Sequence, residues 1–245
     1  RWSICAIEPE PIGTGQPATP SETSSPDLAS WWRTEQAAVP GIGDSLEGVH
    51  AVMAALAAGR VLSLTIERSR AASPEVAEII RVAVEAGIAT ELVEDVTAIS
   101  ATTAPQGVVA RARPIVALPL RELVEKASQP VLIVLDHVED PRNVGAIVRS
   151  AVAAGVGGLV VPNRRSAPLG ATAFKAAVGA FEKLPISVVP SVADAVRQLK
   201  DFGMWTVALD GAATESFYEL KILDEPIALV IGAEGRGVSR LAAEW

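Results

Sequence analysis

The stretch from Val131 to Ser150, VLIVLDHVEDPRNVGAIVRS, decides the fold. It opens on five apolar residues that end at Leu135, a pattern typical of a strand covered on both faces by helices. A helix is expected next, because Asp140 is a good N-cap residue and Pro141 suits the first helical turn. A buried strand that leads into a helix is the repeating unit of α/β proteins.

The same strand pattern recurs downstream, with helical stretches between the apolar runs at 158–161, 186–189, 205–209 and 227–231. Parallel neighbouring strands need crossover connections, so this alternation predicts a parallel sheet. Ligands of such sheets bind beyond the carboxyl ends of the strands. We therefore expect a site in the loops that follow Leu135, Leu209 and Ile231.

A smaller α/β unit is expected upstream, with helices over 49–56 and 74–86 and strands over 61–66, 90–93 and 107–112. Residues 1–45 hold six of the 17 prolines and a Thr/Ser run, which favours a mostly disordered leader. The segment between Pro114 and Pro130 reads as a linker with one short helix, 120–127. The predicted division is a leader over 1–45, a first unit over 46–113, a linker over 114–130 and a second unit over 131–245.

Composition excludes several classes of protein. A chain of 245 residues with 49% apolar and 20% charged residues can build a core, and it has neither a membrane-length apolar run nor a secretory leader pattern. We therefore expect a soluble, cytoplasmic protein. The single cysteine excludes an internal disulfide, and two histidines, His50 and His137, are too few for a zinc cluster, so no metal is expected.

The formal charge of −8 argues against a uniformly basic nucleic-acid binder. Residues 131–190 differ, because they contain six basic and four acidic side chains. An RNA-binding surface, if present, is expected there, although ordinary solvated side chains give the same count.

Two polar residues lie off the apolar face of the helix that begins near Pro141. The apolar stripe follows helical spacing at Val144, Ile147, Val148, Ala151 and Val152, and neither Asn143 nor Arg149 belongs to it. Spacing alone does not assign a function to either residue. Asn143 is also consistent with a first-turn polar residue that binds free backbone amides, and Arg149 with an ordinary solvated helix arginine.

A glycine-rich turn follows the last apolar strand, in the stretch IALVIGAEGRG over 227–237. Gly232, Gly235 and Gly237 allow backbone to approach a ligand closely, and the carboxylate of Glu234 can accept amide hydrogen bonds or face an arginine. Glu234 is also consistent with a simple loop cap. A second exit from strand to glycine, Leu209-Asp-Gly211, is expected at the same sheet edge.

Taken together, these segments resemble the SpoU (TrmH-type) branch of the SPOUT RNA ribose methyltransferases. The resemblance covers 45–245 in the right order, and it is specific because N-x-G-x-x-x-R (143–149) is followed by G-x-E-G (232–235). Upstream, LEGVHAV (46–52) and QGVVA (106–110) resemble the two ends of the L30e-like RNA-binding domain that precedes the catalytic domain in the bacterial 23S rRNA guanosine 2′-O-methyltransferases.

The resemblance implies an α/β-knot domain with a parallel sheet, acting as a homodimer on RNA, with S-adenosylmethionine as the cofactor. Carried over by position, it places Asn143, Arg149 and Glu234 in the active site, with Arg149 engaging the ribose hydroxyl and a phosphate across the dimer. Because an arginine stays protonated, we expect it to orient and to stabilise charge. The implied cofactor contacts are Leu209, Gly211, Ile231, Gly232 and Gly235.

The sequence also departs from the family pattern. The third motif of the family is expected beyond Trp245, so we expect a truncated knot and an inactive or poorly folded fragment. Pro105 stands where the family has a histidine before Gln-Gly, and this changes the expected RNA affinity or target. The alternatives are a non-catalytic RNA-binding relative, an adenosine 2′-O-methyltransferase acting on tRNA or rRNA, and a Rossmann-type enzyme, which the late position of the glycines disfavours.

Overall fold

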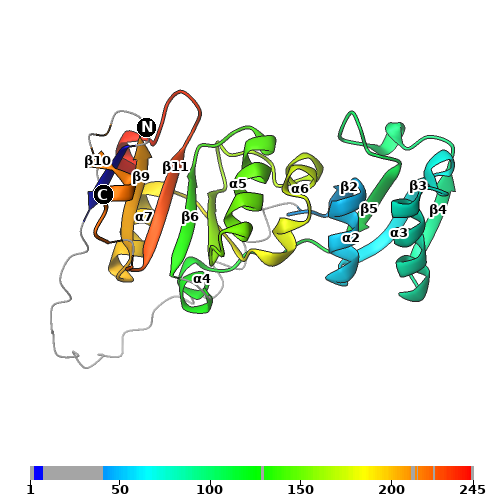
Figure 1. The fold of residues 1–245 in the computed structure, drawn as a ribbon, viewed down its shortest axis with the longest axis horizontal. Coiled ribbons are helices and arrows are strands. Elements are labelled where there is room, and N and C mark those ends of the chain that lie inside the picture. The colour runs from blue at the N-terminus through cyan, green and yellow to red at the C-terminus, as the bar shows by residue number, and fades with distance from the viewer. Residues whose placement is uncertain are drawn as a thin grey trace, which may run out of the picture.

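A computed structural model of the protein describes residues 3–7, 41–127, 130–210, 213, 215–222 and 224–243. The described strands form two sheets, which lie in two units joined side by side (Figure 1). The smaller sheet has the strand order β2-β5-β3-β4, and the larger has the order β10-β1-β9-β11-β6-β7-β8.

The smaller unit has helices on one face of its sheet. In β3, Leu64 and Ile66 point into the core that α2 and α3 cover, because alternate residues of a strand face opposite sides. β3 and β4 are parallel, and β5 runs antiparallel to both β2 and β3. The elements are β2 (Ser45–Glu47), α2 (Val49–Ala57), β3 (Val61–Glu67), η1 (Arg68–Arg70), α3 (Pro74–Glu85), β4 (Ala89–Val93), η2 (Thr97–Ile99) and β5 (Val108–Ala112).

The larger unit has the parallel sheet that the apolar runs predict. α-Helices connect its parallel strands from β6 through β7 and β8 to β9, whereas β10 and the 3-10 helix η4 lie between β9 and β11 in the chain. Each predicted strand lies within one residue of the observed one. The elements are α4 (Leu120–Lys126), β6 (Val131–Asp136), α5 (Pro141–Ala153), β7 (Gly158–Pro162), α6 (Ala171–Ala177), η3 (Ala180–Lys183), β8 (Ile186–Val189), α7 (Val192–Asp201), β9 (Trp205–Asp210), β10 (Glu215–Ser216), η4 (Phe217–Glu219), β11 (Ile227–Gly232) and α8 (Arg240–Ala243).

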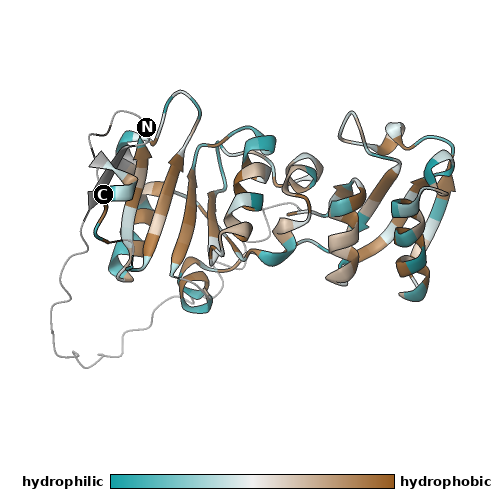
Figure 2. Ribbon diagram, viewed as in Figure 1, coloured by the Kyte–Doolittle hydropathy of each residue, from teal (hydrophilic) through white to brown (hydrophobic). Residues whose placement is uncertain are grey.

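β6 is buried on both faces, which explains its unbroken apolar sequence. Ile133 and Leu135 share a core with α5, whereas Leu132 and Val134 share a second core with α4 and α7. The apolar strands accordingly run through the middle of the molecule while the outer faces of the helices are hydrophilic (Figure 2). This burial fixes β6 at the centre of the sheet.

Within the leader that the sequence predicts to be mostly disordered, Ser3–Ile7 form a strand, β1. β1 pairs antiparallel with β9, with Ile4 opposite Leu209, and also with β10. The reason is that a sheet edge can recruit a short apolar strand from a distant part of the chain, whatever the composition around it. The remainder of the predicted leader before residue 41 lies outside the described residues.

α5 and α6 pack unusually closely. A Cβ atom on Gly145 of α5 would lie 2.5 Å from the carbonyl oxygen of Ala173 in α6. The two helices can therefore come this close only because residue 145 is a glycine. On the apolar face of α5, Val144, Val148 and Ala151 are buried as predicted. The contact ties the position of α5 to that of α6.

Candidate functional site

Two of the expected segments meet at the carboxyl ends of β6 and β11. These strands are parallel neighbours, and Asp136 at the end of β6 pairs with Gly232 at the end of β11. β6 has β7, the next strand in sequence, on its other side. The chain therefore changes direction across the sheet at this point, and open α/β sheets bind ligands at such switch points.

Asp136 is the buried polar group of this edge. Its side chain is fully buried, and Oδ2 accepts a hydrogen bond of 2.6 Å from the backbone amide of Ser239. Oδ1 has no hydrogen-bond partner among the described residues. His137 Nδ1 lies 2.6 Å from Oδ1, but outside hydrogen-bond geometry, and His137 has a left-handed backbone (φ 58°). Oδ1 is thus a buried oxygen at the switch point, and the His137 imidazole is its polar neighbour.

The glycine-rich segment after β11 folds back on itself. A Cβ atom on Gly232 would lie 2.0 Å from the carbonyl carbon of Gly237, and the Gly237 amide donates 3.0 Å to the carbonyl of Ala233. Glu234 and Gly235 are exposed at the tip of this turn, where Gly235 has φ 76°. Glu234 makes no hydrogen bond or ion pair with any described residue, so its carboxylate is available to a ligand or a partner.

The start of α5 lies beside this edge because it follows β6 directly. Asp140 caps the helix by accepting a hydrogen bond of 2.7 Å from the Arg142 amide. Asn143 is half-buried in the first turn, and Arg149 is exposed. Arg149 lies six residues further along, about 9 Å down the helix axis, and the described contacts do not join it to the glycine turn.

Of the expected cofactor contacts, some lie at the sheet edge and one lies at the exposed tip of the glycine turn. Leu209 and Ile231 are half-buried and sit opposite each other at the ends of β9 and β11, next to Gly232. Gly235 is at the exposed tip of the turn, and Gly211 lies outside the described residues.

Sequence reasoning missed the roles of Asp136 and Ser239. The one signal for Asp136 is a charged residue that closes a continuous apolar strand.

Basic side chains are exposed around the α5 side of the unit. Arg142 and Arg149 on α5 and Arg164 and Arg165 after β7 are all exposed. Within the described part of the chain, no cluster of His, Cys, Asp and Glu could hold a metal ion. The described helices include none that is long and apolar enough to span a membrane.

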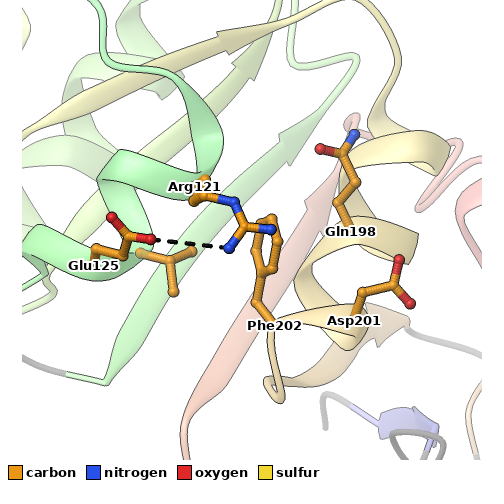
Figure 3. Close-up of a pocket in the computed structure, with 6 residues that line it drawn as sticks. Arg121, Glu125, Gln198, Asp201 and Phe202 are labelled. Carbon is orange, nitrogen blue, oxygen red and sulfur yellow. Dashed lines mark ion pairs between the residues drawn. The ribbon is translucent and has the colours of Figure 1, made fainter. Parts of the chain in front are cut away.

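A cavity of about 520 Å³ lies between α4 and α7, away from the edge formed by Asp136 and Gly232 (Figure 3). There the Arg121 guanidinium sits 4.5 Å above the Phe202 ring, with Glu125 paired to Arg121 at 3.9 Å. α4 leads into the start of β6 and α7 into the start of β9, so this cavity is at the amino ends of the strands. It is therefore separate from the edge formed by Asp136 and Gly232.

Comparisons with known proteins agree with this arrangement. Residues 130–244 match the SpoU rRNA Methylase family, and residues 45–115 match the family described as RNA 2'-O ribose methyltransferase substrate binding. The chain is 42% identical over 142 residues to the 23S rRNA (guanosine-2'-O-)-methyltransferase RlmB of Vibrio vulnificus, covering 57% of each chain. It is 43% identical over 142 residues to RlmB of Escherichia coli K12, covering 57% of this chain and 58% of the relative.

The chain thus spans less than two thirds of the length of these curated relatives. Among solved structures, an rRNA methyltransferase from Sinorhizobium meliloti is similar with a TM-score of 0.65 and 25% identity, covering 82% of this chain and 74% of that one. The SpoU methyltransferase AviRb from Streptomyces viridochromogenes, in complex with AdoMet, shares the fold with a TM-score of 0.61 and 24% identity, covering 82% and 77%.

Proposed function

We propose that the protein transfers a methyl group from S-adenosylmethionine to a ribose 2′-hydroxyl of 23S rRNA. The proposal is supported by the match of residues 130–244 to the SpoU rRNA Methylase family and of residues 45–115 to the family described as RNA 2'-O ribose methyltransferase substrate binding. The proposed target base is guanosine, as in the names of the RlmB relatives. The observation that carries the proposal is the pairing of Asp136 with Gly232, which brings the start of α5 and the glycine turn to one sheet edge.

S-adenosylmethionine suits the residues of this edge. Leu209 and Ile231 offer half-buried aliphatic surface for a purine, and the backbone of the turn after Gly232 offers polar groups beside it. When bound, the cofactor supplies an electrophilic methyl group on a sulfonium. We assign Leu209, Gly211, Ile231, Gly232 and Gly235 to binding it.

Asn143, Arg149 and Glu234 are the residues that we assign to the reaction. Arg149 is exposed and unpaired in the described chain, so its guanidinium is free to bind an RNA phosphate and to orient the ribose hydroxyl. Orientation is the main requirement, because methyl transfer depends on in-line alignment of oxygen, carbon and sulfur. Asn143 and Glu234 flank the same edge and hold polar groups of the substrate there.

We further propose that the protein acts as a homodimer in the cytoplasm. Arg149 lies two helical turns from the start of α5 and has no described contact with the turn that bears Glu234. A second copy of the chain can bring an Arg149 side chain to that turn. Sedimentation of the purified protein tests this, and a monomer at micromolar concentration would contradict it.

The function is tested with radiolabelled S-adenosylmethionine and 23S rRNA, using wild type, Arg149→Ala and Arg197→Ala. Arg197 is a matched control, because it is an exposed helix arginine on α7 that is paired with Asp194. We expect Arg149→Ala to lower kcat by roughly 100-fold and Arg197→Ala to leave it unchanged. Equal rates for all three proteins would remove Arg149 from the mechanism. A wild type that binds rRNA but transfers no methyl group would favour the non-catalytic alternative.

A further inference from the structure

The two units share one hydrophobic core, although the sequence predicts separate units joined by a linker. A single cluster of buried side chains runs from Ile42 and Leu46, at the start of the smaller unit, to Phe174 and Phe181 of the larger one. In Figure 1, α6 lies between α5 and the strand β2. The α6–η3 segment is therefore the part of the larger unit that meets the smaller one.

Backbone approaches closely at two points of this interface. A Cβ atom on Gly43 would lie 2.2 Å from the Phe174 ring, and the Gly43 amide donates 2.9 Å to the carbonyl of Leu169. A Cβ atom on Gly179 would lie 2.6 Å from the Cβ atom of Ala54 in α2. Both glycines have positive φ, a backbone conformation that other residues rarely adopt, so these two close approaches depend on glycine.

A buried ion pair crosses the same interface. The guanidinium of Arg60 contacts both carboxylate oxygens of Glu182, with Nε donating 2.8 Å to Oε2, and the side chains are only 13% and 7% exposed. Another nitrogen of Arg60 donates to the carbonyl oxygens of Gly43 and Arg113. A bidentate pair of this kind constrains orientation more than a single contact does.

Lys175 makes a second polar contact across the interface. Its Nζ atom donates to the carbonyl oxygen of Ala104, in the turn that precedes β5. Lys175 lies on α6 and Glu182 on η3, so the smaller unit is held at two separate points of the α6–η3 segment. α6 in turn packs on α5 at Gly145. A continuous set of contacts thus joins the smaller unit to the helix that bears Asn143 and Arg149.

We propose that Arg60 and Glu182 are positioning residues that lock the two units into one rigid body, so that RNA held by the smaller unit reaches α5 in a fixed orientation. The part of this inference that concerns RNA rests on the proposed function. The physical basis is that separating the partners of a largely buried ion pair leaves an uncompensated charge, so the arrangement that keeps Arg60 and Glu182 paired is favoured over its alternatives. Loss of that geometry lowers the rate of a reaction that depends on alignment.

The inference is tested in the full chain with Arg60→Glu, Glu182→Arg and the double swap, and with Arg60→Lys, which keeps the charge but loses the bidentate fork. Spin labels are placed at Glu75→Cys and Arg197→Cys, on exposed faces of α3 and α7, with Cys5→Ser to remove the native thiol. Arg81→Glu is the control, because Arg81 is exposed and paired only within α3.

We expect a narrow distribution of label distances in wild type, in Arg81→Glu and in the double swap, and a broad one in each single variant. Methylation of rRNA by the single variants falls roughly 10- to 100-fold in kcat/KM, with unchanged S-adenosylmethionine affinity, and the swap restores it. A distribution that stays narrow in Arg60→Glu would overturn the locking role. A wild type that leaves rRNA unmethylated would instead contradict the proposed function, because the label distances are measured without RNA.

Discussion

Oδ2 of Asp136 accepts a 2.6 Å hydrogen bond from the backbone amide of Ser239, and this bond joins the end of β6 to the segment after β11. The donor is a main-chain group. The hydrogen bond is therefore lost only when Asp136 is changed or when the amide hydrogen of residue 239 is removed. The bond closes the base of the glycine turn that bears Glu234.

Asp136→Ala should therefore loosen the glycine turn. We expect a loss of about 1–3 kcal/mol in the free energy of unfolding, because the partly buried Ser239 amide is left without an acceptor. Affinity for S-adenosylmethionine should fall by roughly tenfold or more in calorimetry, if the turn binds it as proposed. Ser239→Pro, which removes the donor, should reproduce both losses, whereas Ser239→Ala should not. Equal cofactor affinity in Asp136→Ala and wild type would contradict a role for this bond in the site.

Gly145→Ala should destabilise the protein although alanine is the better helix former. The helix preference for alanine is worth about 1 kcal/mol, but the new Cβ would lie 2.5 Å from the Ala173 carbonyl oxygen and from the Ala176 Cβ atom. Overpacking of this kind costs about 1–3 kcal/mol or more. Thermal melting measures the difference. Gly170→Ala is the control, since a Cβ atom there meets nothing within 4 Å, and a Tm of Gly145→Ala at or above wild type would show that the helices can separate freely.

Glu47→Gln should weaken the smaller unit locally. The fully buried carboxylate of Glu47 accepts hydrogen bonds from the amides of Ala101 and Thr102 and from the Thr102 hydroxyl. In Glu47→Gln, the side-chain NH₂ group replaces one acceptor oxygen and faces N–H or O–H groups of Ala101 and Thr102. At least one hydrogen bond is then lost, at a cost of about 1–3 kcal/mol. Hydrogen exchange at Ala101 and Thr102 should accelerate, while Glu91→Gln on the exposed face of β4 leaves it unchanged. Unaltered exchange in Glu47→Gln would mean that the loop is held by other contacts.

Asp95 should titrate below the usual range of an aspartate. The side-chain and backbone hydrogen bonds from Thr97 lower the pKa of its carboxyl. A group with a lowered pKa in the folded state stabilises the fold above its unfolded pKa, and this contribution is lost as the pH falls through the folded value. Carboxyl NMR titration measures the pKa directly. Thr97→Val should raise it toward the ordinary value, and an unchanged pKa in that variant would assign the shift to another group.

Local signals explain which parts of the fold the sequence predicts. The apolar run from Val131 to Leu135 and the pair Asp140-Pro141 specify β6 and the start of α5, because each depends on neighbouring residues only. β1 could not be predicted in this way, since its pairing with β9 depends on a strand about 200 residues away. Glu47 would be expected on the surface, and its burial is explained by hydrogen-bond donors on the distant residues Ala101 and Thr102.

In the candidate site too, some features follow from the local sequence pattern and others depend on contacts between distant residues. The carboxyl ends of parallel strands meet at one edge, so the nearness of Leu209 to Ile231 and Gly232 follows from the strand pattern. The bond from Ser239 to Asp136 does not follow, because it depends on how the glycine turn folds back. The roles of Asn143, Arg149 and Glu234 stay predictions, since within the described chain no contact joins Arg149 to Glu234.

The position of β6 between β7 and β11 also has a consequence for synthesis on the ribosome. β6 is the first strand of its parallel sheet to be made, yet its partner β11 ends only at Gly232. Until then one backbone edge of a strand that is apolar from Val131 to Leu135 stays open, and pairings over such long sequence separations form slowly. The nascent protein is accordingly expected to be most prone to aggregate in this interval, and the sheet edge formed by Asp136 and Gly232 is among the last features to form.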